Sequence, residues 1–189
     1  MSSPKRIHIY GHVSAQPQAI ANLFGAQLGT EVIAESDLAI FAINPAAGID
    51  QRTIDQWQAL SDYQLPRLVV VNELDGSDSD FEDAVMLANR VFDQLVTPYL
   101  VLHSESGNPI ALISLTDLQI IDYSTNPPTI SASEVEHQEL VSEFREEYLE
   151  EVSGAGDDAF SAGLLFPAIP IVISNGLGID VVKSFINKL

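Results

Sequence analysis

Leu38-Ala39-Ile40-Phe41-Ala42-Ile43-Asn44-Pro45 and Leu68-Val69-Val70-Val71-Asn72-Glu73-Leu74-Asp75 are the two stretches that decide the fold. Each is a continuous apolar run that ends in polar or turn-forming residues. Such runs are typical of strands buried on both faces, as in a parallel sheet covered by helices. Between them, apolar side chains recur at helical spacing and predict a helix over residues 50–63.

The flanking sequence extends this alternation of strands and helices. Residues 7–10 predict a strand that meets Gly11, and residues 16–28 predict a helix with Leu28 on its apolar face. After Asp75, the capping-box spacing of Ser79 and Glu82 predicts the start of a further helix. The resulting β-α-β-α-β-α order predicts a mostly parallel α/β sheet with helices on both faces.

The pattern changes after residue 97. Short strands are expected at 99–103 and within 110–123, and Ser133 with Glu136 predicts the cap of a helix that runs to about Val152. We expect Val135, Leu140, Phe144 and Val152 to face inward along this helix. A short helix near 158–165, a strand at 169–173 and a closing helix are expected to follow. Residues 97–160 are therefore interpreted as a small α+β insertion within a single domain over 1–189.

Composition sets further bounds. A chain of 189 residues with 46% hydrophobic residues can form one compact domain with a sizeable core. It has no cysteine, which excludes disulfides and thiolate metal sites, and no apolar run long enough to span a membrane. The N-terminal residues lead directly into a predicted strand, so we expect a cytoplasmic protein.

The charge is strongly negative, with 8 Lys and Arg against 27 Asp and Glu and a formal net charge of −19. Such a surface repels nucleic-acid phosphates and anionic lipids, which argues against nucleic-acid binding through a basic patch and against membrane binding. Three interpretations of the acidity remain: a solubilising surface, a basic protein partner, or adaptation to salt.

Seven short strings, in register, resemble the G domain of translational GTPases, most closely that of elongation factor G. They are Gly11-His12-Val13, Ala46-Ala47-Gly48-Ile49, Gln51-Arg52-Thr53, Trp57-Gln58-Ala59, Tyr63, Pro66-Arg67-Leu68 and Asn72-Glu73-Leu74-Asp75. The resemblance implies a P-loop-GTPase-like fold and identifies residues 97–160 with the subdomain that elongation factor G inserts before its last strand. Gly11 and His12 then match the start of the phosphate loop.

The residues needed for GTP chemistry depart from the family pattern. Gln16, Pro17 and Gln18 occupy the part of the loop where the family has the phosphate-binding Lys and the magnesium-binding hydroxyl. The interval 29–37 is too short for the switch-region strands and their catalytic residues. We therefore expect no GTP hydrolysis, no metal site and no cofactor.

Asn72, Asp75 and Ser174 match positions that contact the guanine base in the family, although Glu73 replaces the Lys between the first two. One interpretation is a weak guanine-nucleotide or nucleoside site. The other is that Asn72 and Asp75 only organise the turn after the strand. The acidic run from Asp75 to Asp80 suggests calcium, but Asp83 and Asn89 replace the Gly and Glu that an EF-hand starting at Asp78 requires.

Three functional hypotheses follow. The first is a pseudo-GTPase module for protein interaction or regulation, linked to translation by family analogy alone. The second is the weak guanine-compound binder. The third is a subunit of a larger complex or a homo-oligomer, because loss of the switch-region strands would leave a sheet edge unpaired and in need of a partner, a second copy or a loop.

Overall fold

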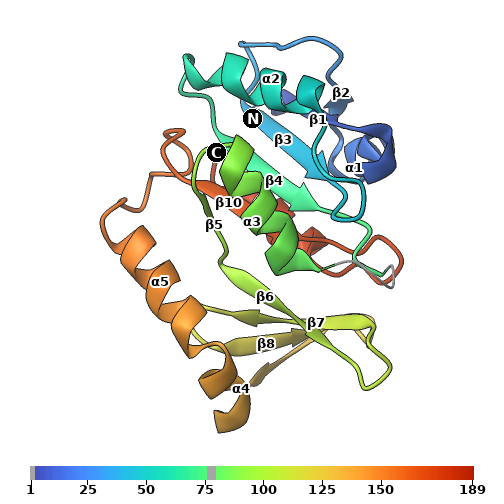
Figure 1. Cartoon of the computed structure of the whole chain (residues 1–189), viewed down its shortest axis with the longest axis vertical. Coiled ribbons are helices and arrows are strands. Elements are labelled where there is room, and N and C mark those ends of the chain that lie inside the picture. The colour runs from blue at the N-terminus through green and yellow to red at the C-terminus, as the bar shows by residue number, and fades with distance from the viewer. Residues whose placement is uncertain (1–2, 76–79) are drawn as a thin grey trace.

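A parallel sheet forms the centre of the computed structural model, which describes residues 3–75 and 80–189 (Figure 1). Its six strands lie in the order β2-β1-β3-β4-β10-β5, and all neighbouring pairs are parallel. Their bounds are Gln27–Leu28 for β2, Ile7–Gly11 for β1, Leu38–Ile43 for β3, Arg67–Val71 for β4, Phe166–Pro170 for β10 and Leu95–Val96 for β5. The predicted α/β class with a mostly parallel sheet is confirmed.

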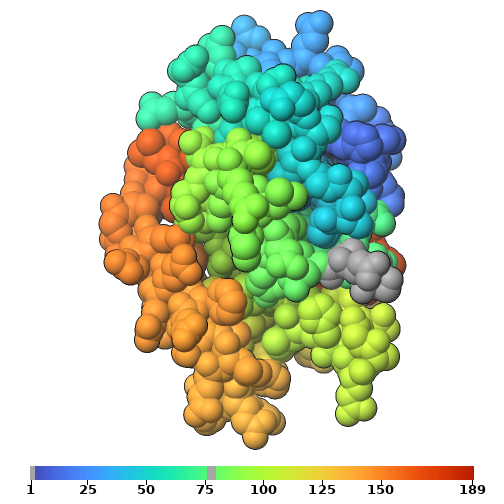
Figure 2. Space-filling view, in the orientation of Figure 1, coloured from blue at the N-terminus to red at the C-terminus, as the bar shows by residue number. Residues whose placement is uncertain are grey.

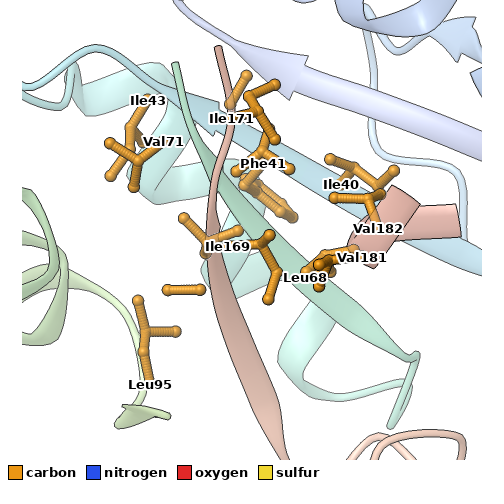
Figure 3. Packing of buried hydrophobic residues seen from close by; sticks show 14 of the residues in the cluster. Ile40, Phe41, Ile43, Leu68, Val71, Leu95, Ile169, Ile171, Val181 and Val182 are labelled. Atoms are coloured by element: carbon orange, nitrogen blue, oxygen red, sulfur yellow. The ribbon is translucent and has the colours of Figure 1, made fainter. Parts of the chain in front are cut away.

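Helices cover both faces of this sheet, as expected. They are α1 (Pro17–Phe24), α2 (Gln51–Ser61), α3 (Phe81–Val91) and α6 (Ile179–Ile186). Phe41 points to the face where it packs edge-on against Trp57 of α2, with ring centroids 5.0 Å apart. Its neighbour Ile40 points to the opposite face, because side chains alternate along a strand, and there it lies beside Val182 of α6 (Figure 3).

A second, antiparallel sheet lies between β5 and β10 in the chain. Its strands are β6 (Tyr99–His103), β7 (Pro109–Ser114), β8 (Gln119–Asp122) and β9 (Thr129–Ala132). The helices α4 (Val135–Leu140) and α5 (Ser142–Ser153) follow. Figure 2 shows α5 and the loop after it along one side of the molecule. The sequence predicted the strands of β6, β7 and β8 but not β9.

The edge of β1 is covered by the chain itself. On the side away from β3, β1 pairs with the short β2, and the Gly29 N–H just after β2 donates to the Ile9 carbonyl at 2.8 Å. A loop therefore satisfies backbone groups that were expected to need covering, so this edge no longer argues for a second copy or partner.

Several predicted helix bounds are wrong. The helix expected over 16–28 ends at Phe24, because Gly25 adopts a left-handed conformation (φ 61°) and its N–H caps the Ala21 carbonyl. Leu28 consequently lies in β2 and is 41% exposed rather than facing the core. Residues 158–165 form turns instead of a helix, and the last strand begins at Phe166, earlier than predicted.

The helix predicted over 133–152 is broken at Val141, whose side chain is buried. Because Val141 takes the inward position, Val135 and Leu140 point to solvent, against the prediction, whereas Phe144 is 44% exposed and lines a pocket with residues of α3 and β5. Ser133 does not cap the helix; its side chain accepts a hydrogen bond from Gln138 at 3.2 Å, and Glu134 holds the N-cap position.

The N-cap of α3 is Asp80, whose side chain accepts from the Glu82 N–H at 2.9 Å. The capping role predicted for Ser79 and the calcium-loop start at Asp78 lie outside the described residues. Among the helices that the structure describes, none is long and apolar enough to cross a membrane.

Candidate functional site

The carboxyl ends of β1, β3 and β4 meet at one edge of the parallel sheet, where α/β proteins place their ligands. Gly11 ends β1 at this edge with φ 154°, and a Cβ atom there would lie 2.5 Å from the Ala42 carbonyl oxygen of β3. The contact with β3 therefore requires a glycine at this position, independently of any ligand.

The loop that follows is a single 3₁₀ turn, η1 (Val13–Ala15), and its N–H groups are used internally. The Ala15 N–H donates to the His12 carbonyl and the Gln16 N–H to the Val13 carbonyl, both at 3.0 Å. The Ser14 N–H donates to Nδ1 of His12 at 3.2 Å. Pro17, the first residue of α1, has no N–H. Residues 14–17 thus present no free backbone donor for an anion.

Two carboxamides from neighbouring strands fix this turn in place. Nδ2 of Asn72, after β4, donates to the Ala15 carbonyl at 3.0 Å, and Nδ2 of Asn44, after β3, donates to the Ser14 carbonyl at 3.0 Å. The Asn72 side chain is buried. Sequence reasoning singled out Asn72 but missed Asn44, because an Asn before Pro after a strand is also an ordinary turn signal.

Gln16 joins the loop to the residues after β4 by donating a hydrogen bond from Nε2 to Oε1 of Glu73. Gln16 and Glu73 both have positive φ, 55° and 63°. The amide of Gln18 instead contacts Asn22 within α1 at 3.2 Å. Asp75 is exposed at the surface.

The structure brings most of the predicted site residues together. Gly11, His12, Gln16, Pro17 and Gln18 line one cleft, which encloses about 600 Å³ between η1, the start of α1, and α2. Ser174 instead lines a separate hollow, which it shares with residues of α6 and of the loop between β8 and β9.

Charge at this edge is sparse. Arg52 of α2 lines the cleft and donates to the Thr30 carbonyl at 2.7 Å. In residues 3–75 and 80–189, no group of three or more His, Asp or Glu side chains could hold a metal ion.

At the start of α3, burial and the hydrogen bond to Asp80 raise the pKa of Glu82 to about 7.

Comparison with known proteins finds sequence relatives that are named as translation factors. No family model matches. The elongation factor G-like protein of Mycobacterium tuberculosis (strain ATCC 25618 / H37Rv) is 26% identical over 167 residues, covering 76% of this chain and 23% of that protein. The mitochondrial ribosome-releasing factor 2 of Drosophila melanogaster is 25% identical over 127 residues, covering 65% and 17%.

A crystal structure of a Thermus thermophilus protein superposes with a TM-score of 0.67 at 21% identity, covering 82% of this chain and 26% of that one. It shows the same fold. The predicted resemblance to elongation factor G is confirmed by the sequence relatives, although the chain spans less than a quarter of their length.

Proposed function

We propose, from this relationship to elongation-factor-G-like proteins, that the chain is a translation-factor-related domain that acts through protein contacts and does not hydrolyse GTP. The relatives support the link to translation. The geometry of residues 12–17 supports the loss of GTP chemistry and is the observation that carries the proposal.

A phosphate loop binds its ligand with backbone N–H groups that converge on the anion, aided by a Lys and a metal ion. Here the donors of Ser14, Ala15 and Gln16 already have acceptors inside the loop. To free them, the 3₁₀ turn would have to open and release the two Asn contacts. That cost would fall on a site that has Gln16 in the loop and Glu73 after β4, neither of which carries a positive charge.

The connection from α1 to β3 supports the same proposal. GTPase switching needs a segment that γ-phosphate can order and hydrolysis can release. Residues 25–37 instead form β2 and a loop hydrogen-bonded to the edge of β1. In the proposed domain this connection stands in place of the switch-region strands and is paired with the edge of β1.

A protein partner would contact the α4–α5 surface, which we define by the exposed apolar residues Val135, Leu140 and Phe144 and the exposed glutamates around them. The glutamates are Glu134, Glu136, Glu139, Glu143, Glu146, Glu147 and Glu150. Apolar side chains that face solvent within an acidic surface suit a partner with basic and apolar groups. By analogy with ribosome-releasing factor 2, the partner would be ribosome-associated.

The first experiment is calorimetry of the purified protein with GTP, GDP, GMP and guanosine, with ATP as control and magnesium present. We expect no magnesium-dependent binding of GTP or GDP and no turnover. Tight binding of either would overturn the proposal. Turnover that is lost in Asp75→Ala would also overturn it, whereas turnover that survives this substitution identifies a contaminant. Guanosine or GMP binding as tight as GTP binding would support a base-reading site at Asp75 instead.

The partner surface is tested by co-sedimentation with purified ribosomes. We expect the double variant Leu140→Ser, Phe144→Ser to lose binding and Leu164→Ser to keep it, because Leu164 is 60% exposed but lies outside the α4–α5 surface. Equal binding by the wild type and the double variant would contradict the assignment of this surface.

A further inference from the structure

A groove that encloses about 200 Å³ lies between α3 and α5. The two helices run in the same direction (Figure 1). Each lines the groove with side chains at positions i, i+3, i+4 and i+7, which share one face of a helix. These side chains are Glu82, Val85, Met86 and Asn89 of α3 and Phe144, Glu147, Tyr148 and Glu151 of α5. The α3–α5 groove is therefore narrow and elongated along both helices.

Much of the wall of the α3–α5 groove is apolar. Leu95 of β5 and Leu100 of β6 line its buried side and are 2% and 4% exposed. Met86 and Phe144 are 56% and 44% exposed, so a large part of their apolar surface contacts water. Covering such surface with an apolar chain is favourable, because it removes that area from water.

A carboxylate lies at each end of the groove. Glu82 is in the first turn of α3 and Glu151 in the last turn of α5. Nε2 of Gln94 donates to Oε1 of Glu151 at 3.3 Å, and the Leu95 N–H donates to Oδ1 of Asn89 at 2.9 Å, so Glu151 lies near the end of α3. Because Glu82 and Asn89 are seven residues apart on a helix, the two carboxylates are about 10 Å apart along the groove.

Neither of these carboxylates has a cationic partner. Within the part of the chain that the structure describes, Glu82 and Glu151 take part in no ion pair. No Lys, Arg or His is among the described residues that line the groove. Burial raises the pKa of both carboxyl groups. A positive charge on a ligand would favour their ionised forms, so the groove is complementary to a cation at each end.

We propose that the α3–α5 groove binds a linear aliphatic diamine, with one ammonium group beside Glu82 and the other beside Glu151. Its methylene chain covers Met86 and Phe144. A nitrogen about 2.8 Å from each carboxylate requires the two nitrogens to lie roughly 5–10 Å apart. Diamines with four to six methylene groups meet this requirement, because an extended chain spans about 1.2 Å per bond.

This site does not rest on the proposed function. It shares Phe144 and Glu147 with the α4–α5 surface, but it needs neither the loss of GTP chemistry nor a ribosomal partner. Diamine binding and ribosome binding are measured separately, so either can fail without the other.

The test is calorimetry in about 0.15 M salt, which screens non-specific attraction to the acidic chain. The ligands are the diamines from 1,3-diaminopropane to 1,8-diaminooctane, with hexylamine as the monoamine. We expect 1,5-diaminopentane to bind about tenfold more tightly than hexylamine, because it makes a second charge-assisted hydrogen bond. Affinity should fall for the shortest and longest diamines. Absence of binding at millimolar concentration would overturn the proposal, and so would equal binding across the series.

Variants assign each end of the groove. Glu82→Gln and Glu151→Gln each keep the side-chain shape and remove one charge, so we expect either to weaken 1,5-diaminopentane binding about tenfold. Glu105→Gln is the matched control, because it removes the same charge from an exposed loop and should bind as the wild type does. Unchanged binding by both groove variants, with circular dichroism confirming their folds, would contradict the assignment.

The pH dependence gives a second readout at Glu82, whose folded-state pKa is about 7. The titratable groups near it on α3, on β6 and across the groove are Asp80, Asp83, His103, Glu147 and Tyr148. Glu82 must lose its proton to pair with an ammonium group, which itself stays charged up to about pH 10. We therefore expect 1,5-diaminopentane to bind about tenfold more tightly at pH 8 than at pH 6, and Glu82→Gln to lose most of this gain. An affinity of the wild type that does not change with pH would contradict the role of Glu82.

Discussion

At the scale of single residues, Arg67 shows how the core holds a charge. Its guanidinium lies 4.3 Å from the Trp57 ring centroid and 4.4 Å from that of Phe166. It also donates to the Trp57 carbonyl at 3.1 Å and pairs with Asp93 at 3.6 Å. Burial lowers the pKa of Arg67, and the charge of Asp93 opposes that shift. One buried cation thus ties β4, α2 and β10 together.

Replacing this cation should destabilise the fold. We expect Arg67→Met to lower the free energy of unfolding by about 2 kcal/mol, because it removes two cation–π contacts and a charge-assisted hydrogen bond while retaining an apolar chain. Urea denaturation measures the change. Arg90→Met, at an exposed position, is the control and should change stability by no more than about 0.5 kcal/mol. Equal stability of both variants would show that the stacked guanidinium contributes nothing net.

At the scale of elements, the 3₁₀ turn after β1 depends on the carboxamide of Asn72. We expect Asn72→Ala to leave the Ala15 carbonyl unpaired, to cost about 1–2 kcal/mol, and to speed hydrogen exchange of the Ala15 and Gln16 amides. Exchange measured by NMR reports on these amides directly. Asn22→Ala, which removes only an exposed contact to Gln18, should leave them protected. Unchanged hydrogen exchange in Asn72→Ala would mean that the turn is rigid without the hydrogen bond from Asn72.

The first turn of α3 gives a pH dependence. Glu82 has a folded-state pKa of about 7, above its usual value of 4.5, so the folded protein holds the proton more tightly than the unfolded chain. This stabilisation is fully present below about pH 4.5 and is lost as the pH rises through 7. We expect Glu82→Gln to be more stable than the wild type at pH 8 by about 1 kcal/mol, after allowance for solvent screening.

The difference between Glu82→Gln and the wild type should shrink steadily between pH 8 and pH 5. Thermal unfolding across this range measures it. Glu105→Gln, in an exposed loop, should show no such trend. A stability difference that does not vary with pH would mean that Glu82 titrates normally in the folded protein.

The parts of the fold that sequence predicted are those set by burial. Continuous apolar runs identified β3 and β4. The candidate site was located by Gly11 at the end of β1 and Asn72 after β4. The helix break at Val141 was not predictable from periodicity, because an apolar residue one position away from the expected stripe took the inward place. The burial of Gln56 was equally hidden, since a Gln inside a helix carries no sequence signal of burial.

At the scale of the whole molecule, acidic side chains far outnumber basic ones, so most charged groups repel one another. Within the described residues, 3–75 and 80–189, the structure has two ion pairs, Arg6–Asp37 and Arg67–Asp93. The formal net charge of the chain is −19. The glutamates of the α4–α5 surface lie on adjacent helical turns. One consequence is seen at Glu151 of α5, where burial and the neighbouring charges of Glu147 and Glu150 raise the pKa of the carboxyl group. Such self-repulsion destabilises the compact state, and mobile ions screen it.

We therefore expect the free energy of unfolding to rise by about 1–2 kcal/mol as monovalent salt increases from about 10 mM to about 500 mM, because the Debye length falls from about 30 Å to about 4 Å. Urea denaturation at each salt concentration measures the change. Sodium chloride and choline chloride should act equally if screening alone is responsible. A requirement for molar sodium would favour salt adaptation. A flat response would show that the acidic surface carries little repulsion, which leaves a solubilising surface or a basic partner as the explanation of its charge.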